Sequence, residues 1–333
     1  MNDSKLRRMA IVGLGSIGRR HLRVLKTTRP EIEVVLVRSG HGGDWPEEDM
    51  ASFNVRTTEE AVSIGVDAAI IASPAPLHVE QARILIKAGV PILIEKPLSV
   101  STAGVDELAA LSEEKNVKAL VGYVLRYSDS FQYFQKMVKS GTAGEPLFVR
   151  VECGSYLPEW RPGQDYRKTA SAKPVLGGGV LLELSHELDY ANTLFGPLEC
   201  VNAIVKNTGS LGLDVEDFAH MAFVSKFSRF PVIVSVDFCR RDAVRACSIH
   251  GTQGTLFWDG INHKVAWQSG GAMVETEAFS IERDEMFCRQ IEHFLRCVES
   301  GEKPKVTIDD AAEVLKLVEA ARKADKKNRA VFL

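Results

Sequence analysis

Short apolar runs alternate with stretches of helical period along the first third of the chain. The runs have the length of strands and are rich in valine and isoleucine: residues 9–12, 33–37, 68–72, 91–94 and 119–122. The stretches between them include 17–27 and 76–88, and the second ends at Gly89, as a helix C-cap should. This alternation predicts an α/β domain with a doubly wound parallel sheet covered by helices.

The pattern changes at about Tyr127. A helix is predicted over 130–139 and ends at Gly141, and a strand over 147–153 precedes a long loop. Consecutive strands with turns between them are expected at 201–206, 218–225, 232–238, 245–250, 254–258 and 264–268. Two further helices are predicted, at 284–300 and 308–326, and the second begins at an Asp-Asp pair.

Two domains follow from this change of pattern. The chain has 333 residues, which exceeds the roughly 100–200 residues of one domain. We expect the α/β domain at 1–124 and an α+β domain, built on a large and mostly antiparallel sheet, at 125–333. The last helix of the second domain could pack back on the first domain.

A glycine turn follows the first apolar run. Gly13-x-Gly15-x-x-Gly18 lies between a buried strand and a helix, where glycines allow a tight turn and close approach of a pyrophosphate. The free amides and partial positive charge of the helix N-terminus then suit the phosphates. The turn predicts a dinucleotide site with Gly13, Gly15, Ser16, Ile17 and Gly18 as contacts. A bare strand-to-helix turn is the alternative.

The end of the second strand bears on the choice of dinucleotide. An NAD site normally places a carboxylate there, about 20 residues after the turn, to bind the ribose hydroxyls. This chain instead has Arg38 and Ser39, and a guanidinium with a hydroxyl suits a 2′-phosphate. NADP is therefore favoured over NAD. The alternative is that Arg38 only stacks on adenine, which leaves NAD open.

Two further segments lie at strand ends, where ligands of a doubly wound sheet gather. Glu95 and Lys96 follow the run 91–94, and both are expected to contact the cofactor. The lysine could also donate a hydrogen bond to a substrate oxygen or move a proton. Ser73, Pro74 and His78 follow the run 68–72 and are expected to line the cofactor, although the histidine could equally cap or pack at its helix.

With these residues the chain resembles the Gfo/Idh/MocA family, which includes glucose-fructose oxidoreductase and inositol dehydrogenase. The shared motifs are the 13–18 turn, Ser73-Pro74 with His78, Glu95-Lys96-Pro97, Gly122-Tyr123-x-x-Arg126-Tyr127, and the 177–183 stretch with His186 and Asp189. The resemblance implies an N-terminal Rossmann domain and a C-terminal sheet domain that often forms the oligomer interface. It also implies Lys96 as the catalytic lysine and His186 as the acid or base.

The stretch after the triple glycine, residues 177–179, shows a helical period of its own. At about 3.6 residues per turn, one helix face should be core: Leu181, Leu184, Leu188, Ala191 and Phe195. The opposite face would carry a polar set: Glu183, His186, Tyr190 and Thr193. The family usually has an aspartate four residues before the histidine, whereas Glu183 stands three before His186, a spacing that keeps both on one face. We expect Glu183 to orient the imidazole, with a less secure role than His186.

The loop at 156–168 combines aromatic rings with arginines. Such a set suits a sugar ring stacked on Trp or Tyr and an acid or phosphate held by Arg. We expect substrate contacts from Arg126, Trp160, Arg161, Tyr166 and Tyr190, and a sugar, sugar acid or nucleotide sugar as substrate. A solvated or interface-forming loop is the alternative.

Composition narrows the function classes. Hydrophobic residues make up 45% and charged residues 26%, as in a globular protein, and the formal net charge of −3 gives no basic surface for nucleic acid. Six dispersed cysteines form no CxxC pair and read as reduced thiols, and no metal site is expected. The apolar stretch after Lys5, Arg7 and Arg8 is too short for an export signal, and no segment suits a membrane span. A cytoplasmic protein is expected.

These observations predict an NAD(P)-dependent oxidoreductase acting on CH–OH groups. We expect His186 to take the proton of the substrate hydroxyl while Lys96 holds the oxygen, and a homodimer or homotetramer as the assembly. Relatives in the resembled family leave two alternatives. One is a glycosidase that works by transient oxidation, and the other is a non-catalytic cofactor-binding regulator, against which Lys96 and His186 speak.

Overall fold

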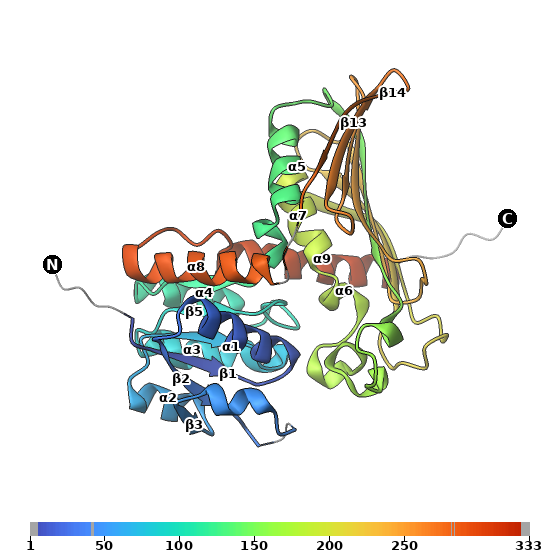
Figure 1. The fold of residues 1–333 in the computed structure, drawn as a ribbon. Helices are drawn as coiled ribbons and strands as arrows, with labels where there is room; N and C mark the ends of the chain where they lie inside the picture. Colours follow the sequence, from blue (N-terminus) through green and yellow to red (C-terminus); the bar gives the residue numbers. More distant parts are fainter. Residues whose placement is uncertain (1–5, 41–42, 281, 283, 328–333) are drawn as a thin grey trace. The chain divides into compact units, whose positions relative to one another are not determined.

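The computed structural model describes residues 6–40, 43–280, 282 and 284–327 (Figure 1). Its internal contacts divide these residues into two compact units. The first holds the described residues of 1–124 and 283–312, and the second those of 125–282 and 313–333. Helix α9 (Ile308–Lys327) is divided between the two units after Ala312.

The first unit contains a six-stranded parallel sheet with the order β3-β2-β1-β4-β5-β6. The strands are β1 (Arg8–Val12), β2 (Glu33–Val37), β3 (Phe53–Val55), β4 (Ala68–Ile71), β5 (Ile92–Ile94) and β6 (Ala119–Val121). The strand order reverses at β1, so the Rossmann-type sheet predicted from the apolar runs is confirmed. Strand β3 was not predicted, because it has three residues and exposes Phe53 and Asn54.

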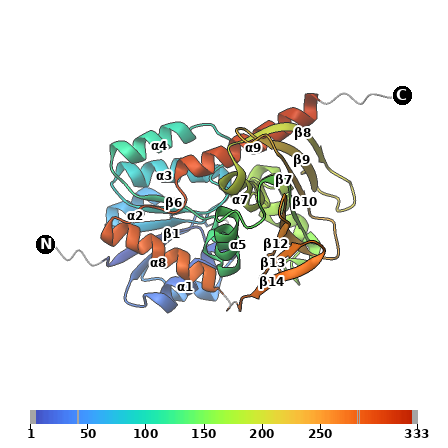
Figure 2. The same ribbon diagram turned by 90° about the horizontal axis from the view of Figure 1, so that it is seen from above.

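Helices cover this sheet (Figure 2). They are α1 (Ser16–Thr28), α2 (Thr58–Ile64), α3 (His78–Lys87), α4 (Val105–Glu114) and α8 (Glu285–Ser300). Helix α8 comes from far along the chain and lies beside α1 in both views. Its apolar face completes the core of the unit, where Phe294 and Ile291 join Leu22 and Leu25 of α1. The amphipathic period of both helices explains this packing.

The second unit contains an eight-stranded sheet with the order β14-β13-β12-β11-β7-β10-β9-β8. The strands are β7 (Pro146–Gly154), β8 (Leu198–Lys206), β9 (Phe218–Ser225), β10 (Pro231–Asp237), β11 (Val244–Gly251), β12 (Thr255–Asp259), β13 (Lys264–Ser269) and β14 (Ala272–Ala278). Only β7 and β10 pair in parallel, so the predicted, mostly antiparallel sheet is confirmed. Strand β14 was not predicted, because every one of its residues is exposed.

Helices pack on one face of this sheet: α5 (Asp129–Lys139), α6 (Val180–Glu183) and α7 (His186–Phe195). Beneath α5 and α7, Phe131, Tyr190 and Trp258 form an aromatic cluster with ring centroids 5.3–5.5 Å apart. The single helix expected after the triple glycine is broken in two. At the break Leu184 has φ −97° and ψ 34°, outside the helical region.

Candidate functional site

The glycine turn has the geometry that its sequence predicts. Gly13 adopts φ +93°, a conformation open to glycine, and its N–H donates to the carbonyl of Val37 at 2.9 Å. A Cβ on Gly18 would lie 2.1 Å from the carbonyl oxygen of Gly13. The turn, the start of α1 and the end of β2 therefore meet at the carboxyl edge of the sheet.

The start of α1 fits a pyrophosphate. A Cβ added to Gly15 would meet nothing within 4 Å, so the backbone there is open to approach. Among the described residues no side chain caps the helix, and its first turn, which includes Ser16 and Ile17, holds no acidic residue. Free amides at the positive end of a 13-residue helix are a suitable anion site.

Arg38 follows β2 but is held by groups of this chain. Its Nη2 donates to the carbonyl of Gly43 at 2.5 Å, and its Nη1 forms an ion pair with Glu48. Ser39 beside it is exposed. The sequence has no carboxylate at the end of β2, but the fold brings the carboxylate of Glu48 to Arg38 at this position. The sequence did not predict the role of Glu48, because the nine residues between Arg38 and Glu48 follow no periodic pattern.

The segment after β4 holds the predicted Ser73, Pro74 and His78. Ser73 Oγ donates to Gln81 Oε1 at 2.6 Å, and Pro74 is exposed. The His78 ring is buried, with its nitrogens 3.0 Å from the carbonyl of Pro97 and 2.8 Å from that of Ser73, and burial lowers its pKa. The side chain of His78 thus links the segments that follow β4 and β5, which agrees with the packing role, and its contact with the cofactor stays a prediction.

Glu95 is also turned inward. It is 5% exposed, its Oε1 lies 2.6 Å from His21 Nε2, and its Oε2 accepts from the Lys96 amide at 3.1 Å. The carboxylate of Glu95 is thus bound within the chain, and its contact with the cofactor stays a prediction. Lys96 itself is half-buried and lies at the carboxyl end of β5, two strands from β1 and at the same edge as the glycine turn.

In the second unit, Glu183 ends α6 and His186 begins α7. Both are half-buried, while the predicted core residues of these helices are buried, as expected: Leu181, Leu184, Leu188, Ala191 and Phe195. Glu183 and His186 are thus more exposed than the core face of these helices, and their roles at the site stay predictions.

Tyr190 does not belong to the predicted polar face. It is fully buried, and its ring packs 5.4 Å from Phe131 and 5.5 Å from Trp258. The prediction that Tyr190 projects away from the core is wrong, because this side of α7 packs against Phe131 of α5 and Trp258 of β12. Next to it the buried Glu187 accepts from Arg245 at 2.9 Å. This ion pair was missed, since a glutamate within a polar helical stretch gives no sign of burial.

Arg126 and Asp189 form a two-pronged ion pair. Nε of Arg126 lies 2.9 Å from one carboxylate oxygen of Asp189, and Nη2 lies 2.6 Å from the other. The aspartate is 2% exposed. Because a guanidinium matches a carboxylate in this fork geometry, the pair fixes the orientation of Arg126. Its contact with substrate stays a prediction.

The loop expected to bind substrate is tied into the second unit. Trp160 Nε1 donates to Ser155 Oγ at 2.7 Å, and the ring meets Phe238 edge-on at 5.3 Å. The Tyr166 hydroxyl donates to the carbonyl of Leu211 at 3.0 Å. These bonds hold both aromatic side chains in place. Arg161 is half-exposed, and all three substrate contacts stay predictions.

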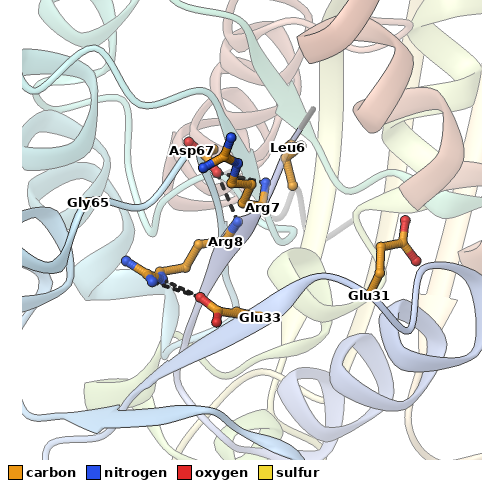
Figure 3. A pocket seen from close by; sticks show the side chains of 7 residues that line it. All are labelled: Leu6, Arg7, Arg8, Glu31, Glu33, Gly65 and Asp67. Carbon is orange, nitrogen blue, oxygen red and sulfur yellow. Dashed lines mark hydrogen bonds and ion pairs between the residues drawn. The ribbon is translucent and has the colours of Figure 1, made fainter. Parts of the chain in front are cut away.

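A polar cavity of about 640 Å³ lies elsewhere on the first unit (Figure 3). Its lining residues are Leu6, Arg7, Arg8, Glu31, Glu33, Gly65 and Asp67. They gather at the amino ends of β1 and β2, the edge opposite the glycine turn. Arg8 pairs with Glu33 at 2.7 Å, and Asp67 accepts two backbone amides at 2.8 Å. Arg8, Glu33 and Asp67 are therefore engaged in contacts within the fold, and the candidate site is at the opposite edge, beside the glycine turn.

The described residues contain neither a cluster of metal ligands nor a helix that could span a membrane. No group of three or more His, Cys, Asp or Glu side chains lies together as metal ligands would. No helix in this part of the chain combines the length and apolar character needed to cross a membrane.

Comparison with protein families decides the class. Residues 7–123 match the model of an oxidoreductase family with an NAD-binding Rossmann fold, GFO_IDH_MocA. Residues 135–333 match the model for the C-terminal alpha/beta domain of the same family. The chain belongs to the Gfo/Idh/MocA family. It is an NAD(P)-dependent oxidoreductase.

Relatives of this Gfo/Idh/MocA protein match it over nearly its whole length. Myo-inositol 2-dehydrogenase of Thermotoga maritima is 26% identical, with 98% of both chains covered. The scyllo-inositol 2-dehydrogenase (NAD(+)) of Bacillus subtilis is 24% identical, covering 91% of this chain and 90% of that one. Among solved structures, levoglucosan dehydrogenase in complex with NADH has a TM-score of 0.83 at 17% identity, covering 96% of this chain and 97% of that one.

A second solved structure holds the other cofactor. KijD10, a 3-ketoreductase from Actinomadura kijaniata in complex with NADP and TDP-benzene, has a TM-score of 0.81 at 20% identity. It covers 96% of this chain and 98% of its own. Both likenesses show the Gfo/Idh/MocA fold, and the relatives named here include holders of NADH and of NADP.

Proposed function

We propose that this protein transfers hydride between a nicotinamide cofactor and a hydroxyl-bearing carbon of a sugar, sugar acid or nucleotide sugar. The observation that carries the proposal is the common edge of the first sheet. The open backbone at Gly15 and the amine-bearing Lys96 both lie there, after the ends of β1 and β5. Ligands of doubly wound sheets bind at this edge.

The names of the relatives support the substrate class. Two of them are inositol dehydrogenases, and a solved relative was captured with NADH and levoglucosan. Inositols and levoglucosan each carry secondary hydroxyl groups on a ring. The aromatic and basic loop around Trp160, Arg161 and Tyr166 has the side chains to bind such a ring, with Arg126 as a further polar contact.

We assign the following roles to residues of this chain. Bound nicotinamide would supply the hydride acceptor or donor. Lys96 donates a hydrogen bond to the reacting oxygen, and His186 takes the hydroxyl proton during oxidation and returns it during reduction. Glu183 orients the imidazole. The backbone amides of Gly15, Ser16 and Ile17 hold the pyrophosphate, with Gly13 and Gly18 shaping the turn and Ser73 and Pro74 lining it.

NADP is the cofactor that we propose this protein prefers. Arg38 and the exposed Ser39 stand where the 2′-phosphate of the adenosine ribose would lie, after the second strand. A guanidinium binds phosphate through paired hydrogen bonds. The preference is expected to be small, because Arg38 already has a carboxylate partner.

We also propose a homodimer or homotetramer in the cytoplasm. The face of the second sheet that lies away from α5 and α7 exposes apolar side chains, among them Ile204 and Phe257, which are 44% and 39% accessible. Apolar patches of this kind favour association. All six cysteines are free thiols, as suits a reducing compartment. Light scattering of the purified protein tests the assembly.

The experiment for the proposed function is a substrate panel. Inositols, levoglucosan, sugar acids and nucleotide sugars are offered with NAD and with NADP, and the absorbance of reduced nicotinamide is followed. We expect turnover with at least one ring alcohol, and its loss in Lys96→Ala. Chemical change of a sugar without net cofactor reduction would support the glycosidase alternative instead. Cofactor binding without turnover on any member would support the regulator.

A further inference from the structure

A carboxylate lies where the sequence of the second strand's end has none. After Val37 the chain reads Arg38-Ser39, without an acidic residue. The short helix η1 (Pro46–Met50) folds back so that Glu48 Oε2 pairs with Nη1 of Arg38. The two side chains are 25% and 18% exposed, so solvent and small ligands can reach the pair.

The position of Glu48 is fixed by several contacts. Its second oxygen, Oε1, accepts the backbone N–H of Trp45 at 2.9 Å. The guanidinium of Arg19 lies 3.7 Å from the centroid of the Trp45 ring, a cation–π contact with the first turn of α1. Glu47 binds Arg23 of the same helix at 2.5 Å. Glu48 is thus held between the glycine-turn helix and the end of β2.

This place is where a dinucleotide of this fold puts its adenosine ribose. A carboxylate there binds the 2′-hydroxyl of NAD, whereas an arginine binds the 2′-phosphate of NADP. This chain has both groups, and they are paired with each other. The 2′-phosphate must therefore take Arg38 away from Glu48 and lie beside a negative charge. NAD leaves the ion pair intact, and its ribose hydroxyls can donate hydrogen bonds to the carboxylate of Glu48.

We propose that Glu48 is the residue that limits the preference for NADP and allows NAD to bind. The proposal rests on the nicotinamide-dependent function and deepens it. It assigns cofactor discrimination to a residue outside the glycine motif and ten positions after Arg38. Arg38 and Glu48 act as one unit, and the charge of the glutamate determines the relative affinities for NAD and NADP.

Calorimetric titration of NAD⁺ and NADP⁺ against the purified full chain tests the proposal without any substrate. In Glu48→Gln we expect NADP⁺ to bind about tenfold more tightly, because a charge-assisted hydrogen bond no longer competes for Arg38. NAD⁺ should bind several-fold more weakly. The matched control is Asp49→Asn, which removes the same charge from the neighbouring, exposed residue. Its ratio of the two dissociation constants should stay within about twofold of wild type.

A second variant tests whether the effect passes through Arg38. In an Arg38→Ala background, Glu48→Gln should improve NADP⁺ binding by less than about threefold, since the competed group is gone. The thermal midpoint of each variant without cofactor reports whether it is folded. An equal cofactor ratio in folded Glu48→Gln and Asp49→Asn would overturn the inference alone. Failure of wild type to bind either cofactor would overturn the proposed function and the inference together.

Discussion

His21 Nε2 lies 2.6 Å from Glu95 Oε1, and the two side chains are closed to solvent. The histidine belongs to α1, the helix that starts at the glycine turn, and the glutamate immediately precedes Lys96. Phe287 of α8 meets the imidazole edge-on, with centroids 5.7 Å apart. The pair thus fixes the helix of the phosphate site to the strand end that carries the proposed catalytic lysine.

Breaking this pair should cost stability. In His21→Ala the Glu95 carboxylate is left buried without its partner, and we expect about 3 kcal/mol less free energy of unfolding. Urea titration followed by circular dichroism measures the change. The control is Glu33→Gln, which breaks the more exposed pair with Arg8 and should cost less than about 1 kcal/mol. Equal losses in the two variants would contradict the importance of burial.

The glycine turn makes a second prediction that separates folding from binding. Gly15 has φ −70° and open space around its Cβ position, so Gly15→Ala should fold with a nearly unchanged thermal midpoint. Its methyl group would occupy the approach of the pyrophosphate, and cofactor affinity should fall at least tenfold, as measured by calorimetry.

Gly18→Ala is the matched variant. Its Cβ would lie 2.1 Å from the Gly13 carbonyl oxygen, so we expect both stability and cofactor binding to fall. Tight cofactor binding by Gly15→Ala would show that the phosphates do not lie on this turn.

The sequence predicted these central features because they have local signals. Alternating apolar runs specify the first sheet, and glycine spacing marks the turn. Strand β14 carried no such signal, since all its residues are exposed and no buried face imposes a period. The burial of Tyr190 depends on contacts with Phe131 and Trp258, which are both far away along the chain. The pairing of Glu48 with Arg38 likewise arises only from folding.

The fork between Arg126 and Asp189 makes a third prediction. Lysine in place of Arg126 keeps the charge but cannot contact both carboxylate oxygens at once. We expect Arg126→Lys to lower the free energy of unfolding by about 1–2 kcal/mol, and Asp189→Asn by more, because it puts a neutral amide in place of the carboxylate that faces a mostly buried guanidinium. Urea titration of both variants measures this. If Arg126→Lys matched wild type in stability, the two-pronged geometry would contribute nothing.

Cys153 predicts how stability depends on alkaline pH. Burial, and then the charge of Glu187, raises the pKa of its thiol from 9.0 to about 12 in the folded chain. Because its pKa is raised on folding, the protonated thiol contributes to the free energy of unfolding. This contribution is fully present below about pH 9 and is lost as the pH rises toward about 12. Above pH 9 the unfolded chain loses the thiol proton first, which lowers the free energy of unfolding by up to about 1.4 kcal/mol per pH unit.

Comparison of wild type with Cys153→Ala isolates this effect. Urea titrations at about pH 8 and about pH 10.5 should show a steeper loss of stability for wild type, by roughly 2 kcal/mol over the interval. The alanine variant lacks the thiol and serves as the reference for wild type at each pH. Identical slopes for the two proteins would contradict the raised pKa.

Turnover of Lys96→Ala and His186→Ala, measured with the best ring alcohol of the substrate panel, tests the central claim most directly. If Lys96 holds the reacting oxygen and His186 moves its proton, each variant should lose about 10²–10⁴-fold in kcat. Calorimetry on the same samples should show cofactor dissociation constants close to that of wild type. Near-normal turnover in both variants would contradict the proposed catalytic roles.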